Sequence, residues 1–175
     1  MSTPNSASWY ACYTRARHEK RVDGRLRERG FDSYLPLVPR QRQWHDRKKV
    51  VHFPLFPSYV FVRTPLRDVT EVLSTPGVST VVRFNGRPVS IRDEEIANVR
   101  RLTRALARAN QAEVEAAPTV DEGERIRVGS GPFKGIEGIV LELRGRDRAV
   151  IQVGLRTIRL GIKVEVEAAA LRRLG

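Results

Sequence analysis

Few residues of this sequence have the types and spacing that catalysis or metal binding requires. The three histidines, His18, His45 and His52, lie in basic sequence without paired cysteines or a His-x-x-x-His spacing, the patterns typical of zinc sites. The single cysteine, Cys12, lies in an apolar segment, where a cysteine is usually a small buried residue and not a nucleophile. We therefore expect no metal and no cofactor.

Acidic residues and glycines offer no catalytic motif either. Asp93, Glu94 and Glu95 are adjacent carboxylates, but they open a predicted helix, where acids stabilise the helix dipole. The run 129–131, Gly-Ser-Gly, lacks the Lys-Ser or Lys-Thr that follows in a phosphate-binding loop. An enzyme that processes nucleic acid would need a metal or a nucleophile that these residues do not supply. The sequence therefore predicts a binding protein and not an enzyme.

Positive charge is the strongest signal in the composition. The formal net charge is +12, and residues 1–110 contain 21 Lys and Arg against 10 Asp and Glu, whereas residues 111–175 contain 11 against 10. This asymmetry indicates nucleic acid or an anionic membrane surface as a partner. No apolar run is long enough to span a bilayer, the N-terminal residues lack the pattern of a secretory signal, and one cysteine excludes an internal disulfide. We expect a cytoplasmic protein.

Two basic segments carry most of this charge. The first, residues 15–29, has Val22 and Leu26 four residues apart amid six arginines and a lysine, which predicts a helix with one narrow buried stripe. Its basic faces fit a phosphate-binding surface and a merely solvated surface about equally. The second segment, residues 40–53, predicts a protruding hairpin with Trp44 among its cations and with His45 and Asp46 near its tip. Such a hairpin suits stacking on an unpaired base, although charged residues also protect an exposed sheet edge from aggregation.

The most apolar stretch of the chain is Phe53 to Arg63, FPLFPSYVFVR. In an extended strand the side chains alternate between two faces, so Val60 and Val62 share a small aliphatic face while Tyr59 and Phe61 share an aromatic one. The aliphatic face is expected to pack against helices. The aromatic face is either a second core layer or an exposed docking patch.

These elements predict an α+β protein of two domains. The first, residues 9–108, combines a mostly antiparallel sheet with helices, the last of which has its apolar residues at helical spacing from Ile96 to Leu106. Residues 1–8 are expected to be disordered and residues 109–120 to form a linker. Residues 121–175 contain short β-rich segments between Gly-rich or charged turns, which indicates a small β-barrel.

Several motifs, in the same order along the chain, resemble the NusG family of transcription elongation factors. The resemblance extends from about Trp9 to Leu174. It implies an N-terminal NusG domain (NGN), an α/β sandwich that binds RNA polymerase, joined by a linker to a C-terminal KOW domain, an SH3-like β-barrel that recruits other factors. The motifs are Trp9-Tyr10, LFPSYVFV at 55–62, TPGV at 75–78, SIRDEEI at 90–96 and GERIRVGSGPFKGIEGIV at 123–140.

The resemblance also implies roles for particular residues. In the family an apolar patch on the sheet docks on the clamp helices of RNA polymerase, and basic residues near the first helix approach the non-template DNA strand of the transcription bubble. A loop of the KOW domain contacts ribosomal protein S10 or the terminator Rho. The matching positions are Ala11, Tyr13, Phe56, Tyr59, Phe61 and Phe84 for polymerase, Arg15, Arg17, Arg21 and Thr75 for DNA, and Pro132, Phe133, Lys134 and Ile136 for the KOW partner.

From sequence alone, Phe133 is expected first as a plug over the barrel, ahead of a role in partner contact. The runs 39–62 and 77–91 resemble the specialised paralogues RfaH, UpxY and relatives, which serve particular long operons. We thus expect a monomeric factor that suppresses pausing and modulates termination or antitermination. The alternatives are a general housekeeping NusG and a ribosome-associated RNA-binding KOW protein.

Overall fold

The computed structural model describes residues 5–109, 115–118 and 123–175. The chain divides into two compact units, Met1–Leu37 with Pro54–Asp93 and Val38–Phe53 with Glu94–Gly175. No helix in these described ranges is long and apolar enough to cross a membrane.

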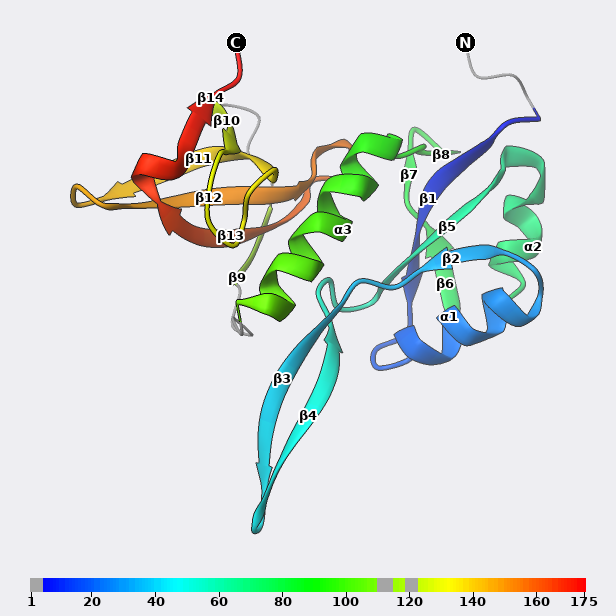
Figure 1. The fold of residues 1–175 in the computed structure, drawn as a ribbon. Coiled ribbons are helices and arrows are strands. Elements are labelled where there is room, and N and C mark those ends of the chain that lie inside the picture. The colour runs from blue at the N-terminus through cyan, green and yellow to red at the C-terminus, as the bar shows by residue number, and fades with distance from the viewer. Residues whose placement is uncertain (1–4, 110–114, 119–122) are drawn as a thin grey trace. The chain divides into compact units, whose positions relative to one another are not determined.

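The first unit is built on a four-stranded antiparallel sheet with the strand order β2-β5-β1-β6 (Figure 1). Strand β1 lies inside the sheet and pairs with β5 from Ala7 opposite Pro65 to Tyr13 opposite Tyr59. A separate two-stranded sheet, β7 with β8, turns at Asn85-Gly86, a residue pair that favours tight turns. The strands are β1 (Ala7–Thr14), β2 (Asp32–Tyr34), β5 (Tyr59–Pro65), β6 (Val78–Val81), β7 (Arg83–Phe84) and β8 (Arg87–Pro88).

Two helices, α1 (Glu19–Glu28) and α2 (Val69–Leu73), pack against one face of this sheet. They close a core in which Val60 and Val62 contribute the strand side, so the expected aliphatic face is confirmed. Burying such side chains contributes roughly 1.5–3 kcal/mol each. The core consists of Tyr10, Cys12, Val22, Leu26, Leu35, Val60, Val62, Val69, Val72 and Val81.

Both helices begin later than the sequence predicts. The helix expected from Arg15 starts at Glu19, because the amide of Arg15 donates instead to the carbonyl of Gly77 (3.0 Å) and Arg17 has a positive φ of 62°. Thr64 and Pro65 are residue types that favour the N-cap and the first position of a helix, but they belong to β5 opposite Ser8 and Ala7. A 3-10 turn, Leu66–Asp68, precedes α2. In both places tertiary hydrogen bonds prevail over local helix signals.

The second unit contains a hairpin, a long helix and a β-rich domain. The hairpin strands β3 (Leu37–Trp44) and β4 (Arg47–Pro54) pair only with each other among the described strands, and their turn lies at His45 and Asp46 as predicted. Helix α3 spans Asp93–Arg108. From Glu94 onward this helix belongs to the same compact unit as the C-terminal strands. The sequence predicted it as part of the first domain.

The β-rich domain is a six-stranded antiparallel sheet with the order β14-β10-β11-β12-β13-β9. Short 3-10 turns, Arg156–Ile158 and Ala168–Ala170, connect its later strands. The strands are β9 (Glu115–Pro118), β10 (Arg125–Val128), β11 (Glu137–Arg144), β12 (Arg148–Leu155), β13 (Leu160–Glu167) and β14 (Leu171–Arg173).

The segments expected to be irregular are only partly described. Of residues 1–8, the first four lie outside the described residues, and β1 already begins at Ala7. Within the expected linker 109–120, residues 110–114 and 119–120 lie outside as well. Glu115–Pro118 form β9, which pairs with β13 from Pro118 opposite Leu160 to Glu115 opposite Lys163. Part of the expected linker thus adds an edge strand to the C-terminal sheet.

Burial predicts that Cys12 is chemically inert in the folded protein. Its thiol is fully buried, and this burial raises its pKa to about 12. At pH 8.5 about half of an exposed cysteine would be thiolate, since its ordinary pKa is about 8.5, but almost no thiolate of Cys12 exists in the folded protein. We expect a disulfide reagent such as DTNB to react with the native protein at least about a hundredfold more slowly than with urea-unfolded protein. Fast reaction of the native protein would contradict this expectation.

The pKa of Cys12 is higher in the folded protein than in the unfolded chain. The contribution of Cys12 to stability is therefore complete below about pH 8.5 and declines as the pH rises toward 12.

Candidate protein and nucleic-acid interface

An aromatic face covers the side of the first sheet opposite the helix-packed core. Strand pairing places Ala11 opposite Phe61 and Tyr13 opposite Tyr59, and Phe56, in the turn before β5, meets Phe61 edge to face at 6.2 Å between ring centroids. The structure therefore brings together five of the six residues expected to contact polymerase. The sixth, Phe84, lies on the separate β7–β8 sheet and is 72% exposed.

This face has a buried part and an accessible part. Ala11, Phe56 and Phe61 are buried, whereas Tyr13 is 44% exposed and Tyr59 is half-buried. The two tyrosine rings pack edge to face at 5.3 Å. Burial raises the pKa of Tyr59, and the neighbouring Tyr13 adds to the rise, so the Tyr59 hydroxyl stays protonated at neutral pH. The two alternatives for the aromatic strand, a core layer and an exposed docking patch, thus apply to different residues of the same face.

Two aromatic residues that the sequence analysis did not assign to this face extend it. Trp9 packs edge to face on Tyr34 at 6.5 Å, and Tyr34 lies 6.4 Å from Phe61. Alternation along β1 already puts Trp9 on the side of Ala11 and Tyr13. For Tyr34 the decisive observation is its register opposite Phe61 in β2–β5, which the sequence does not reveal.

The residues expected to approach DNA lie around the start of α1. Arg15, Arg17 and Arg21 are exposed, and the backbone of Arg15 is held beside Gly77 by its hydrogen bond to that carbonyl. Thr75, on the same loop as Gly77, is buried, and its Oγ1 accepts a hydrogen bond of 2.5 Å from Arg29. The structure brings this loop to the three arginines, but the Thr75 side chain itself is engaged inside the protein.

Other arginines of α1 fasten the helix to that loop. Arg25 donates to the carbonyl of Pro76 at 2.7 Å, and Arg29 donates to the carbonyl of Glu71 at 2.7 Å and to the Ser74 hydroxyl at 3.2 Å. Gly77, with a φ of 97°, lets the loop approach so closely that a Cβ there would lie 2.8 Å from Val22 Cγ2. Sequence reasoning treats all arginines of the helix alike and so misses these structural ones.

A buried carboxylate connects α1 to the turn before β5. Glu19 is 7% exposed, and its Oε1 accepts a 2.8 Å hydrogen bond from the backbone amide of Ser58. Ser58 has a positive φ of 68°, and its carbonyl in turn accepts from the amide of Thr14 at 2.8 Å. Glu19 thus fixes the turn that carries Phe56 toward the aromatic face.

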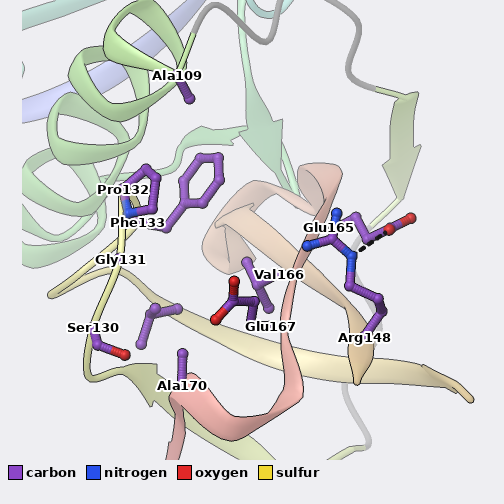
Figure 2. A pocket seen from close by; sticks show the side chains of 11 residues that line it. Ala109, Ser130, Gly131, Pro132, Phe133, Arg148, Glu165, Val166, Glu167 and Ala170 are labelled. Atoms are coloured by element: carbon purple, nitrogen blue, oxygen red, sulfur yellow. Dashed lines mark hydrogen bonds and ion pairs between the residues drawn. The ribbon is translucent and has the colours of Figure 1, made fainter. Parts of the chain in front are cut away.

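In the second unit, the loop expected to contact a KOW partner borders a cavity of about 260 Å³ (Figure 2). Phe133 and Ile136 are buried, whereas Pro132 and Lys134 are exposed. The cavity is also lined by Val166 and by the ion pair in which Arg148 Nε lies 2.9 Å from Glu165. Only two of the four predicted contact residues therefore offer accessible surface.

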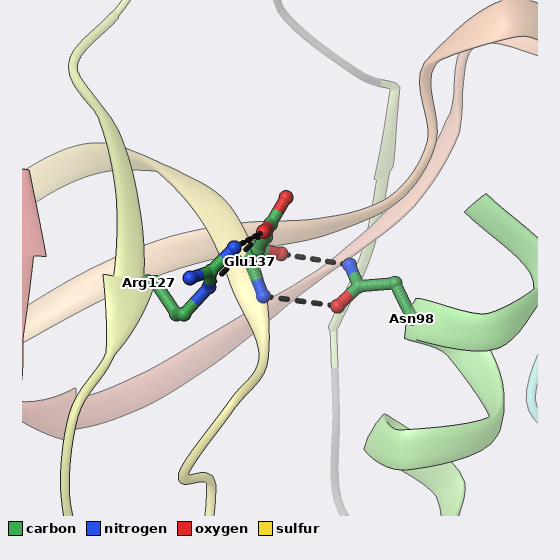
Figure 3. Close-up of polar contacts among 3 residues, drawn as sticks. All are labelled: Asn98, Arg127 and Glu137. Atoms are coloured by element: carbon green, nitrogen blue, oxygen red, sulfur yellow. Dashed lines mark hydrogen bonds and ion pairs between the residues drawn. The ribbon is translucent and has the colours of Figure 1, made fainter. Parts of the chain in front are cut away.

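Helix α3 is attached to the β-rich domain by two polar side chains. The Asn98 amide donates to the carbonyl of Glu137 at 2.8 Å and accepts from its amide at 2.9 Å (Figure 3). Glu95, 9% exposed, accepts from the amide and the hydroxyl of Thr157 at 2.9 and 2.5 Å. The sequence analysis assigned Glu95 only to the helix dipole, because nothing local reveals a partner 62 residues away.

Comparisons with known proteins identify one family for this chain. The family described as "Transcription termination factor nusG" matches residues 7–100, more than half of the chain. The transcription termination/antitermination protein NusG of Thermus thermophilus is 27% identical over 168 residues, 85% of this chain and 90% of that protein. The protein of the same name from Deinococcus radiodurans is 32% identical over 79% of this chain and 84% of its own.

A solved structure shares the fold. The structure described as "Domain interaction in Thermotoga maritima NusG" covers 97% of this chain and 98% of its own, with a TM-score of 0.52 and 23% sequence identity. This similarity agrees with the expected α+β domain followed by a β-rich domain.

Replacing Glu19 by alanine is expected to destabilise the first unit by about 1–3 kcal/mol, the cost of removing the charged acceptor of the partly buried Ser58 amide. The measurement is equilibrium unfolding in urea. Glu28→Ala is the matched control, because Glu28 is exposed at the end of the same helix, and it is expected to change stability by less than about 0.5 kcal/mol. Equal effects of the two substitutions would contradict the role given to Glu19.

Asn98→Ala is expected to loosen α3 from β11 without unfolding the sheet. The Glu137 amide then loses its acceptor, and its hydrogen exchange is expected to accelerate about five- to tenfold, as one lost hydrogen bond of about 1 kcal/mol implies. The experiment is native-state hydrogen exchange by NMR. Arg101→Ala, on the exposed side of α3, is the control, and unchanged exchange in Asn98→Ala would show that the contact carries no free energy.

Proposed function

The chain belongs to the NusG family of transcription factors, and from this premise we propose that it binds RNA polymerase through the aromatic face and suppresses pausing. Binding, and not bond making, is the mechanism. The first unit holds the polymerase clamp closed, and the protein thereby modulates termination or antitermination. The observation that carries this proposal is the accessible tyrosine pair, Tyr13 and Tyr59, on an otherwise buried aromatic face.

The free energy of binding comes from aromatic side chains. Tyrosines are enriched among the residues that dominate protein interfaces, since they combine a large apolar ring with a polar hydroxyl. Tyr13 and Tyr59 make the direct contact with the clamp helices, together with the exposed Phe84. Ala11, Phe56 and Phe61 are buried, so they contribute by stabilising the sheet and its turn and not by direct contact.

We extend the proposal to the non-template DNA strand, which Arg15, Arg17 and Arg21 contact near the start of α1. Their exposed guanidinium groups can bind phosphates and stack on unpaired bases. Thr75 acts through the loop it holds, since its hydroxyl already accepts from Arg29. Charge at this surface is expected to set the salt dependence of binding.

A partner of the second unit, ribosomal protein S10 or Rho, is proposed to dock beside Pro132 and Lys134. Pro132 is exposed at the rim of the cavity and Lys134 is exposed two residues further along the loop, whereas Phe133 and Ile136 are buried. We further propose that the factor serves particular operons, as the resemblance of runs 39–62 and 77–91 to the specialised paralogues suggests. General action on all transcripts is the alternative.

The test of the polymerase proposal is the double substitution Tyr13→Ala, Tyr59→Ala. We expect it to weaken binding to purified bacterial core RNA polymerase by roughly ten- to a hundredfold, as loss of one or two interface aromatics of 1–3 kcal/mol implies. In single-round transcription over a pause-rich template, the variant is expected to lose the acceleration of pause escape that the wild-type protein gives.

Leu66→Ala is the matched control, because Leu66 is also exposed in the first unit, at 53%, but lies off the aromatic face. Circular dichroism and urea unfolding show whether both variants fold. Wild-type affinity of the folded double variant would overturn the proposal. Phe61→Ala is unsuitable for this purpose, because removing a fully buried phenylalanine costs about 3–5 kcal/mol of stability.

A further inference from the structure

The hairpin β3–β4 carries features that the proposed polymerase contact does not use. Residues 41–50 are all exposed, and Trp44, next to the turn, is 66% exposed. The only other tryptophan of the chain, Trp9, is 6% exposed. Charged residues alone suffice to keep an exposed sheet edge soluble, so this role does not explain an exposed tryptophan. The indole buries more apolar surface on binding than other side chains do.

Cations flank this indole on one face of the ribbon. Arg40, Arg42 and Trp44 alternate on β3 and so point to the same side. A two-residue turn brings Trp44 opposite Arg47, and alternation then puts Lys49 on that side as well. Within the described part of the chain, neither Arg47 nor Lys49 forms an ion pair, and the nearest acid in sequence, Asp46, lies in the turn.

Two of these cations are already held in place. The guanidinium of Arg40 lies 5.3 Å from the centre of the Phe53 ring, and that of Arg42 lies 5.0 Å from it. Such cation–π contacts restrict the side chains before any partner arrives, which lowers the entropy lost on binding. An open hollow of about 550 Å³ at the tip is lined by Trp44, Arg47 and Lys49, with His45, Asp46 and Lys48.

We propose that this face of the hairpin binds single-stranded DNA, with one base stacked on Trp44 and the adjacent phosphates on Arg42, Arg47 and Lys49. Interleaved cations and aromatics are the pattern by which proteins hold unpaired strands without reading their sequence. In a duplex the base faces are already stacked, so an exposed indole has no base to bind. The cations of this face donate to phosphate oxygens, and DNA is the strand that they meet because the proposed function, on which this choice rests, places the protein beside an exposed DNA strand. The site is separate from α1 and does not depend on polymerase.

The experiment uses the full-length protein without polymerase and a fluorescein-labelled 15-nucleotide oligo(dT). Affinity is measured by anisotropy between 50 and 200 mM salt, and indole fluorescence is recorded in parallel with unlabelled oligo(dT). Because Trp9 is buried and Trp44 exposed, stacking is expected to quench Trp44 selectively. Trp44→Phe should keep most of the affinity and lose the quenching, whereas Trp44→Ala should weaken binding about tenfold or more.

The charge of the face is tested with Arg47→Gln. We expect weaker binding and a salt slope reduced by about 0.7, the value for one phosphate contact on a single strand. Arg146→Gln, in the exposed β11–β12 turn, is the matched control and is expected to leave both quantities nearly unchanged. The DNA duplex of the same length and oligo(rU) serve as competing probes, and both are expected to bind more weakly than oligo(dT).

Three results would overturn the proposal. They are unquenched Trp44 fluorescence at saturating DNA, equal affinity of Trp44→Ala and wild-type protein, and preference for the duplex or for oligo(rU) over oligo(dT). None of them bears on the aromatic face, since Trp44 belongs to the hairpin and the assay contains no polymerase.

Discussion

The antiparallel pairing of β1 with β5 is the constraint on which both faces of the first sheet depend. The register sets Ala11 opposite Phe61 and Cys12 opposite Val60. Because side chains alternate strictly, a slip of one residue would exchange the aliphatic and the aromatic face. The same pairing therefore builds the core under α1 and α2 and, on the reverse side, the surface that we assign to polymerase.

Arg25 in α1 and Arg29 directly after it fasten the helix without losing their charge. Arg25 and Arg29 donate to the backbone carbonyls of Pro76 and Glu71, which are neutral acceptors. A hydrogen bond to a neutral group fixes a guanidinium but does not cancel its field, as an ion pair with a carboxylate would. The helix is thus fastened to its loop while its surroundings, including the exposed Arg15 and Arg21, stay strongly positive. Stability and attraction for an anionic strand come from the same residue type.

The sequence predicted those features that alternation, turn chemistry and composition determine locally. The two faces of 53–63, the hairpin turn at 45–46 and the division into an α+β part and a β-rich part are such features. Contacts between distant residues were out of reach: Glu19 with the Ser58 amide and Glu95 with Thr157 join polar groups 39 and 62 residues apart. Helix starts were displaced for the same reason, because hydrogen bonds made at Arg15 come from a loop that folds back from elsewhere.

The burial of the aromatic face explains how it can serve as a docking surface at all. An exposed cluster of phenylalanines would be an aggregation hazard and would lose conformational freedom on binding. Here Phe56 and Phe61 are buried, and Tyr13 and Tyr59 pack edge to face on each other, which limits their rotation. Most of the ordering cost is therefore met during folding. A partner that covers the two tyrosines buries their remaining apolar area, while their hydroxyls can stay hydrated at the rim of the contact. This favours strong binding through a small exposed area.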